Sequence, residues 1–278
     1  MVGGLSTVTN SSALIALQAL SFQNKRLIDT QLTITTGLRV SGPQQDGAAF
    51  AIATRLRGDV GGLNAVKTAL ATGEAQVNVA VSAAKSVADT LTEIKAKVVQ
   101  ANQSGLDTAS RSALDADFTE LRSQLQTIVD SADFNTVNLI KRSASTLNVL
   151  SSVDGSVIAV SAQRLDVTTI GIATLSLSTS AGAATALTAV NSAIELAADK
   201  LAALGTSAKR LEIQSDFTTN LLTSFAEGIG VQVNADLAEA SALLQSQQIQ
   251  QQLSVQALAI ANAAPSLVLS LFPAPKGR

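Results

Sequence analysis

Acidic side chains are the residues of this sequence best suited to chemistry, because carboxylate oxygens are the preferred ligands of Ca²⁺. Asp115 and Asp117 form one close pair, and Asp130 and Asp133 form another. Neither pair has the spacing or the glycine of an EF-hand loop, so a solvated helix face explains them better than a cation site. The sequence holds no cysteine and no histidine. Thiolate sites, the commonest zinc sites and the usual catalytic triads are therefore excluded, and we expect no metal, cofactor or catalytic residue.

A second candidate is the pair of glycines in Gly228-Ile-Gly230. A dinucleotide-binding loop needs a third glycine and a preceding strand, and both are missing. The favoured interpretation is a joint between two helices. The segment 174–185 is rich in Ser, Thr, Gly and Ala and is interpreted as an exposed connection.

Composition narrows the class of protein further. The chain has 278 residues, of which 46% are apolar and only 3% aromatic, so its core is aliphatic. The net charge of −2 and the pI of about 5.2 argue against a nucleic-acid binder, which normally carries a basic patch. No run approaches the roughly 18 to 20 apolar residues of a membrane span, and the N-terminus lacks a secretory signal. We expect a soluble protein, or one exported by a route that cleaves no signal.

One long segment, 49–101, keeps an apolar heptad period from end to end, which is typical of a coiled-coil helix. At about 1.5 Å per residue this helix would be roughly 80 Å long, so it needs other long helices beside it. Only Asp59 and Gly73 interrupt the seam. Its members are Ala49, Ile52, Leu56, Asp59, Leu63, Val66, Leu70, Gly73, Val77, Ala80, Ala84, Val87, Leu91, Ile94, Val98 and Ala101.

Two further segments have matching seams and are predicted to pack beside the first. After a turn at 102–105, a helix over about 114–132 forms an antiparallel partner. A third long helix runs from about Ala183 to Ile229. Between them the period changes to 2 over about 137–170, and Asp154-Gly155 predicts a two-residue β-hairpin turn. The predicted rod core includes Leu56, Leu63, Leu70, Val77, Leu91, Leu121, Leu125, Leu201 and Leu211.

The two ends of the chain each predict one more amphipathic helix. The first starts at an N-cap within Thr9-Asn10-Ser11-Ser12 and stops at Gly37 and the Ser41-Gly42-Pro43 turn. The last follows Gly230, is rich in Gln and Ala, and has Pro265 inside or at the end of its pattern. Antiparallel packing of the long helices brings both end helices together. The predicted fold is therefore mainly α, a long antiparallel coiled-coil rod with a small β-hairpin region and paired terminal helices.

Four spaced segments resemble the signatures of bacterial flagellins. Residues 35–56 read T-T-G-L-R-V-S-G-P-Q-Q-D-G-A-A-F-A-I-A-T-R-L, similar to S-S-G-L-R-I-N-S-A-x-D-D-A-A-x-x-A-I-A-x-R of that family. Residues 134–139, F-N-T-V-N-L, resemble its F-N-G-x-x-L. Residues 235–249 and 265–271 resemble its D-x-A-x-x-x-x-x-L-x-x-Q-Q-I and P-x-x-V-L-x-L. The order of these segments and their spread over nearly the whole chain make a chance match improbable.

The resemblance implies a secreted structural subunit of the extracellular flagellar filament, used in swimming motility. It implies an inner terminal-helix domain (1–42 plus 231–278), a rod domain (43–230) and no outer variable domain. Its partners would be other flagellin copies, sibling flagellins included, with the type III export apparatus, an export chaperone, and the hook-junction and cap proteins. The assembly residues would be Leu17, Leu20, Leu27, Ile34, Leu38, Ile249, Leu253, Ile260, Leu267 and Leu271. Family habit adds candidate O-glycan acceptors at Thr174, Ser176, Ser178, Thr179 and Ser180.

The sequence departs from the family pattern at three places. Glu93 stands where relatives recognised by an animal immune receptor have an arginine. Gly61-Gly62 is expected to soften the long helix by roughly 1 kcal/mol per glycine. Pro273–Arg278 extends past the usual end. Two alternatives remain open: a hook–filament junction protein with similar ends, and a secreted enzyme built into a flagellin scaffold, which the short 140–183 segment and the missing His and Cys disfavour.

Overall fold

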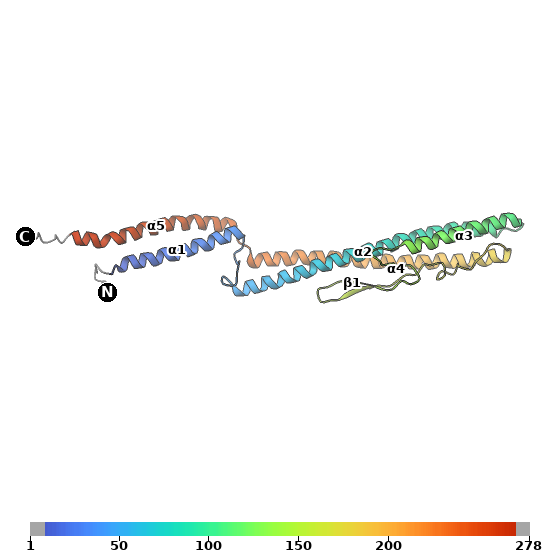
Figure 1. Cartoon of the computed structure of the whole chain (residues 1–278), viewed down its shortest axis with the longest axis horizontal. Coiled ribbons are helices and arrows are strands. Elements are labelled where there is room, and N and C mark those ends of the chain that lie inside the picture. The colour runs from blue at the N-terminus through green and yellow to red at the C-terminus, as the bar shows by residue number, and fades with distance from the viewer. Residues whose placement is uncertain (1–8, 271–278) are drawn as a thin grey trace, which may run out of the picture. The chain divides into compact units, whose positions relative to one another are not determined.

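The computed structural model describes residues 9–270 of the 278-residue chain. Within them it contains five helices and one two-stranded antiparallel sheet, so the predicted fold class is confirmed (Figure 1). One compact unit comprises Met1–Gly58 with Phe225–Arg278, and the other comprises Asp59–Ser224. The elements are α1 (Ser11–Thr36), α2 (Gly47–Ala101), α3 (Thr108–Ser131), β1 (Leu147–Leu150), β2 (Val157–Val160), α4 (Ser180–Val233) and α5 (Leu237–Ser270).

The core of the Asp59–Ser224 unit is aliphatic apart from Phe118, and it is formed by α2, α3, α4, the strands and the segments that connect them. Every member of the α2 seam from Leu63 to Ala101 is buried. Of the predicted rod residues, Leu121 and Leu201 are half-buried and pack against this core. The fully buried ones include Leu70, Val77, Leu91, Leu125 and Leu211.

The predicted seam and the buried face diverge at the beginning of α2. Ile52, which the heptad places in the seam, is 47% exposed, whereas the next residue, Ala53, is completely buried. Ala53 belongs to a small separate cluster with Val40, Ala49 and Val233. Leu56 is half-buried and lies in the unit formed by the chain ends. The 37–40 segment packs against the beginning of α2. The helix therefore presents Ala53, a small residue, to this segment, although the heptad period had placed Ile52 there.

Helix α3 returns along α2, as its short connection predicted. The N-cap is Asp107, whose Oδ1 accepts a 2.7 Å hydrogen bond from the backbone N–H of Ser110. This bond holds the pKa of the Asp107 carboxyl below its ordinary value. Buried Arg111 donates from Nη1 to the carbonyl of Ala101 at 2.5 Å, which satisfies the last turn of α2. The side chain of Arg111 thus links the beginning of α3 to the end of α2.

The β-hairpin lies where Asp154-Gly155 indicated, but its turn is longer than predicted. Strand β1 pairs with β2 in the register Leu147↔Val160 to Leu150↔Val157. The Ser151 N–H donates to the Ser156 carbonyl at 2.8 Å, which leaves a four-residue turn. A two-residue type I′ turn needs two consecutive residues with positive φ. Gly155 has φ of +85° and Asp154 has no positive φ, so the short turn cannot form.

Two glycines of α2 make room for this hairpin. A Cβ atom on Gly73 would lie 2.6 Å from Cγ2 of Val149, and one on Gly62 would lie 2.8 Å from Cγ1 of Val153. The hairpin is also tied to α4, because Gln214 donates from Nε2 to the Ser151 carbonyl at 2.9 Å. Gly73 therefore interrupts the leucine seam because β1 packs directly on the helix backbone at that point.

Gly73→Ala tests this close approach. Alanine normally stabilises a helix by roughly 0.5–1 kcal/mol relative to glycine, but here we expect a loss of about 1–3 kcal/mol from overpacking against Val149. Gly61→Ala is the matched control, since nothing lies within 4 Å of its added Cβ. Urea unfolding should move the two variants in opposite directions. Equal stabilisation by both substitutions would mean that the hairpin does not need Gly73.

The turn that follows α3 is strained at one residue. Phe134 and Val137 exchange two backbone hydrogen bonds of 2.9 and 3.0 Å, and the residues between them, Asn135 and Thr136, have φ of 49° and 66°. Positive φ is tolerated by asparagine but is costly for a β-branched residue. The F-N-G-x-x-L pattern places glycine where this chain has Thr136. Threonine at position 136, where the motif has glycine, therefore lowers the stability of the folded chain.

Thr136→Gly should therefore stabilise the chain, by about 1 kcal/mol, even though glycine has the more flexible unfolded state. The control is Thr168→Gly, at an exposed turn residue without positive φ, where only the entropic cost remains. Thermal melting of both variants would check the prediction. A Thr136→Gly variant that melts no higher than the Thr168→Gly variant would contradict it.

The unit formed by the chain ends contains α1 and α5. Asn10 caps α1 by accepting from the Ala13 N–H at 3.0 Å, and Gly37 ends it with φ of +70°, both as predicted. The predicted joint at Gly228 and Gly230 is wrong, because α4 continues through both glycines to Val233. Neither glycine has positive φ, so the helix keeps them. Pro265 lies inside α5.

The two chain segments that lead into α1 and α5 are bonded to each other. Leu38 and Asn234 form an isolated antiparallel bridge. The Arg39 N–H donates to the Val233 carbonyl at 2.8 Å, and the Ala235 N–H donates to the Gly37 carbonyl at 3.0 Å. The Arg39 guanidinium adds a 2.7 Å bond to the Gln232 carbonyl. Residues 37–40 and 232–235 thus form one paired joint.

Candidate interaction surface

Helices α1 and α5 lie side by side as an antiparallel pair (Figure 1). Asn10, before α1, donates from Nδ2 to the carbonyl of Ala261 near the end of α5, at 2.7 Å. Further along α1, Gln23 donates from Nε2 to the Gln247 carbonyl at 3.4 Å. The contacts on α5 move toward its beginning as those on α1 move toward its end. The sequence prediction that the two end helices meet is consistent with these contacts.

The most buried side chains of the seam between the two helices are polar, whereas its leucines and isoleucine are only half-buried: Leu20, Leu27 and Ile34 of α1 and Leu244 and Leu258 of α5. The buried residues of α1 are Gln23 and Thr30, each 7% exposed. Gln247 of α5 is 2% exposed, and its Oε1 atom has no hydrogen-bond partner in the described part of the chain. Ordinary amphipathic helices bury their leucines and isoleucines against each other. This pair instead places amides and a hydroxyl at its centre.

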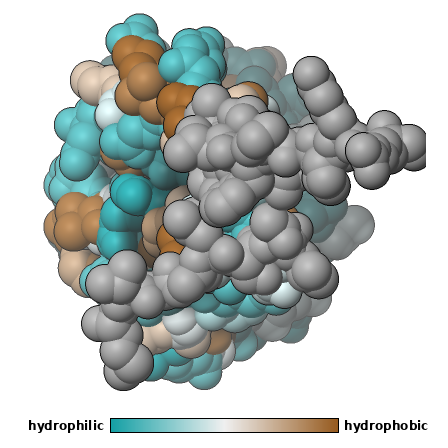
Figure 2. All heavy atoms as spheres, turned by 90° about the vertical axis from the view of Figure 1, so that its left-hand side faces the viewer, coloured by the Kyte–Doolittle hydropathy of each residue, from teal (hydrophilic) through white to brown (hydrophobic). Residues whose placement is uncertain are grey.

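Large apolar side chains cover the outside of the pair. Ile15, Phe22 and Ile28 of α1 are 61–68% exposed, and Ile260 of α5 is 73% exposed. Figure 2, turned so that the left-hand side of Figure 1 faces the viewer, shows hydrophobic side chains at the surface between hydrophilic ones. Exposed apolar surface on this scale marks an interaction site. The exposed set is Leu14, Ile15, Leu17, Phe22, Ile28 and Leu32 with Leu237, Leu243, Ile249, Leu253, Val255 and Ile260.

The structure separates the predicted assembly residues into two groups. Leu17, Ile249, Leu253 and Ile260 are exposed on the outside. Leu20, Leu27 and Ile34 are half-buried and share a helical face with Gln23 and Thr30, while Leu38 packs against the Val40 cluster. Leu267 lies within α5, and Leu271 and the 273–278 tail lie outside the described residues.

Several outer residues were missed by following one heptad track along the last helix. Leu237, Leu243 and Val255 are 41–51% exposed and widen the apolar surface of α5. They do not share the spacing of Ile249, Leu253 and Ile260, so a single seam excluded them. A search for the whole apolar sector of a helix, instead of one line of residues, would have included them.

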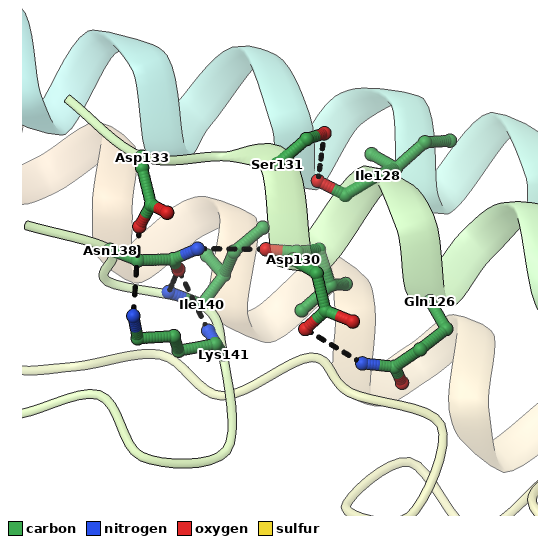
Figure 3. Close-up of polar contacts among 9 residues, drawn as sticks. Gln126, Ile128, Asp130, Ser131, Asp133, Asn138, Ile140 and Lys141 are labelled. Atoms are coloured by element: carbon green, nitrogen blue, oxygen red, sulfur yellow. Dashed lines mark hydrogen bonds and ion pairs between the residues drawn. The ribbon is translucent and has the colours of Figure 1, made fainter.

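Each acidic candidate has a partner within the protein. Asp115 accepts from the Leu177 N–H at 2.5 Å and from Ser176, and Asp117 pairs with Lys97 at 2.7 Å. Asp130 accepts from Gln126 at 3.0 Å, and Asp133 lies 3.6 Å from Lys141 (Figure 3). Across residues 9–270, no three acidic side chains gather as metal ligands. The four aspartates are therefore used in contacts within the protein: Asp115, Asp117 and Asp133 contact other segments, and Asp130 contacts its own helix.

Asn138 anchors the segment that leaves α3. Its Nδ2 donates to the Val129 carbonyl at 2.8 Å, and its Oδ1 accepts from the backbone N–H groups of Ile140 and Lys141, both at 2.9 Å (Figure 3). The side chain is 4% exposed, so all three bonds are shielded from water. Asn138 thus fixes the path of the chain toward the hairpin. In the sequence, Asn138 stands out only as part of the F-N-T-V-N-L motif.

The five candidate glycan acceptors are all exposed, but their hydroxyl groups differ. Ser176 donates to Asp115 at 3.1 Å, and Thr179 Oγ1 accepts from the Gly182 N–H at 3.0 Å. Helix α4 begins at Ser180, three residues before the predicted start near Ala183, so the exposed connection is shorter than expected. The cap supplied by Thr179 accounts for the earlier start. Thr174, Ser178 and Ser180 are the other three acceptors.

No helix found in residues 9–270 combines the length and the apolar character that crossing a membrane requires.

Comparison with known proteins gives a consistent result. The model of the bacterial flagellin N-terminal helical region matches residues 8–145, and that of the bacterial flagellin C-terminal helical region matches residues 187–272. Flagellin FljM of Caulobacter vibrioides is 40% identical, with 95% of this chain and 97% of that protein covered. A flagellin of Brucella melitensis is 34% identical, with 96% and 99% covered. The crystal structure of Bacillus cereus flagellin is 20% identical with a TM-score of 0.45, covering 58% of this chain and 93% of the other.

Proposed function

Because this chain belongs to the bacterial flagellin family and is a structural subunit of the flagellar filament, we propose that its copies polymerise through the outer faces of α1 and α5. One observation carries the proposal: the pair buries glutamine and threonine and exposes Phe22, Ile28 and Ile260. The relatives are named flagellins, and nothing in them favours the hook–filament junction alternative.

The energetics support this assignment. Burying a large apolar side chain contributes about 1.5–3 kcal/mol, whereas a typical hydrogen bond contributes a net 0.5–1.5 kcal/mol, roughly. Because Leu20, Leu27 and Ile34 are only half-buried in the inner seam, the α1–α5 pair gains little from burying apolar surface within one chain. The apolar side chains on its outer faces could contribute more if another copy covered them. Stacking many copies in a head-to-tail manner buries these faces without limit on the number of subunits.

Within this proposal the predicted assembly residues have two roles. Leu17, Ile249, Leu253 and Ile260 contact other copies, because they are exposed in one chain. Leu20, Leu27 and Ile34 hold α1 beside α5, and Leu38 packs at the joint. We assign Leu267 and Leu271 to contacts between copies on sequence alone. We propose that residues 1–42 with 231–278 form the terminal-helix domain and that residues 43–230 form the rod domain.

The remaining parts of the proposal concern export and modification. We propose that the chain is secreted through the flagellar export apparatus with a chaperone, meets the hook-junction and cap proteins, and has no catalytic role. Sibling flagellins are the natural co-assembling partners. For O-glycans, Thr174 and Ser180 are better acceptors than Ser176 and Thr179, whose hydroxyl groups are already bonded.

Removing both ends tests the proposal. A truncated chain of residues 43–230 and the full chain are polymerised in salt and viewed by negative-stain electron microscopy. The full chain should build long filaments and the truncated one none. Circular dichroism of the truncated chain is the control, since the Asp59–Ser224 unit has its own core and should remain helical. Long fibres from the truncated chain would refute the role of the end helices.

A further inference from the structure

We propose that the amide pair of Asn24 and Gln251 sets the axial register of α1 against α5, and thereby lines up the outer apolar faces for polymerisation. Gln251 donates from Nε2 to Oδ1 of Asn24 at 2.8 Å, and both side chains are half-buried in the seam. This inference rests on the proposed function, because the register matters only if the outer faces make the filament contacts.

The hydrogen bonds given by Asn10, Gln23 and Gln251 in the described part of the α1–α5 pair differ in how well they distinguish one register from another. Asn10 and Gln23 both donate to backbone carbonyls, and every residue of a helix offers a carbonyl. A shifted pairing can replace those bonds. The Asn24–Gln251 bond joins two side chains, so it exists only where an amide faces an amide. In the described part of the chain it is the one side-chain-to-side-chain hydrogen bond found between these helices.

Sliding α5 by one heptad removes this pairing. Seven residues before and after Gln251 stand Leu244 and Leu258. Either shift would place a leucine opposite Asn24, and the half-buried Asn24 amide would lose its side-chain partner in the seam. A purely apolar seam would lose little, because one leucine would take the place of another. Buried polar residues at such positions are known to fix the register of paired helices.

The register also decides which outer residues stand together. A one-heptad slide moves α5 by about 10 Å along α1. Phe22 and Ile28 of α1 would then stand beside different residues of α5. Copies in different registers would present different apolar surfaces, and a regular polymer needs one repeated surface. In the seam between α1 and α5, the Asn24–Gln251 contact therefore matters more for fixing the register than for the stability that it adds.

Two double variants separate register from stability. Asn24→Leu with Gln251→Leu removes the amides and keeps apolar bulk in the seam. Asn24→Gln with Gln251→Asn exchanges the amides and keeps their bond. We expect the exchanged variant to polymerise like the parent, and the leucine variant to yield about tenfold fewer sedimenting filaments, as expected for loss of one specific half-buried hydrogen bond. Its rod should melt as in the parent.

A crosslink reports the register directly. The chain has no cysteine, so Ala13→Cys with Leu258→Cys, two positions that line one small pocket, can be joined by a short bismaleimide during polymerisation. The crosslinked fraction should match the parent in the exchanged variant and fall about tenfold in the leucine variant.

Two outcomes would overturn the inference: a leucine variant that crosslinks and polymerises as the parent does, or one that crosslinks normally but does not polymerise. Failure of the proposed function looks different. In that case Leu253→Asp, which leaves the Asn24–Gln251 pair in place, would polymerise normally whatever the crosslink shows.

Discussion

Leu253→Asp is expected to abolish filament formation while the Asp59–Ser224 unit stays folded. Leu253 is 57% exposed on the outside of α5, so a single chain tolerates aspartate there. In the polymer the same position is buried against another copy, and an unpaired carboxylate in such a place is very costly. The cost is repeated in every subunit, so even a few kcal/mol per contact would prevent growth.

The matched control is Gln252→Asp, which adds the same charge at the neighbouring exposed and already polar residue. Sedimentation and electron microscopy should show filaments from the control and none from Leu253→Asp, with equal circular dichroism melting of the rod. Leu27→Asp should also prevent assembly, but Leu27 is half-buried beside α5, so it would disturb the helix pair itself. Normal filaments from Leu253→Asp would exclude this face of α5 from the contacts.

Leu70→Ala should destabilise the folded subunit by about 2–5 kcal/mol. Leu70 is completely buried in the core of the Asp59–Ser224 unit, between Val66 and Val77 on the α2 seam. Truncation removes three buried carbons and leaves a cavity that long packed helices cannot readily close. For a domain of this size, each kcal/mol lowers the melting temperature by about 2–4 °C.

Ile213→Ala serves as the comparison, because Ile213 is 58% exposed on α4. Exposed truncations of this kind usually change stability by less than about 0.5 kcal/mol. Chemical unfolding of unpolymerised subunits measures both variants without the filament contacts. If Leu70→Ala unfolds at the same urea concentration as Ile213→Ala, the assignment of the rod core is wrong.

The long helices were predictable because their period is repeated many times. Between Leu63 and Ala101, turning α2 so that another face met the core would expose every leucine of the seam. Only one face of this helix can therefore be buried. The α4 seam follows the same rule, with Val190, Leu204 and Leu211 fully buried. Helix ends with a defined side-chain cap, such as Asn10, were also predictable, because the capping bond is local.

What could not be predicted depends on contacts between distant residues. Gly73 is a defect in the sequence pattern and becomes meaningful only beside Val149. Glycines at 228 and 230 are common joint residues, yet the paired segments at 37–40 and 232–235 place the joint beyond them. The polar seam of α1 and α5 was hidden for another reason. The sequence shows which residues are apolar, but not whether a partner helix or another copy covers them.

The paired joint also has a consequence for the order of folding. Its bonds connect residues nearly two hundred positions apart, as in the Arg39–Gln232 contact with a separation of 193. Closing so long a loop is slow, and it cannot happen before both termini have been made or delivered. The Asp59–Ser224 unit uses shorter connections and can fold first. We therefore expect α1 and α5 to be the last elements of the chain to pack.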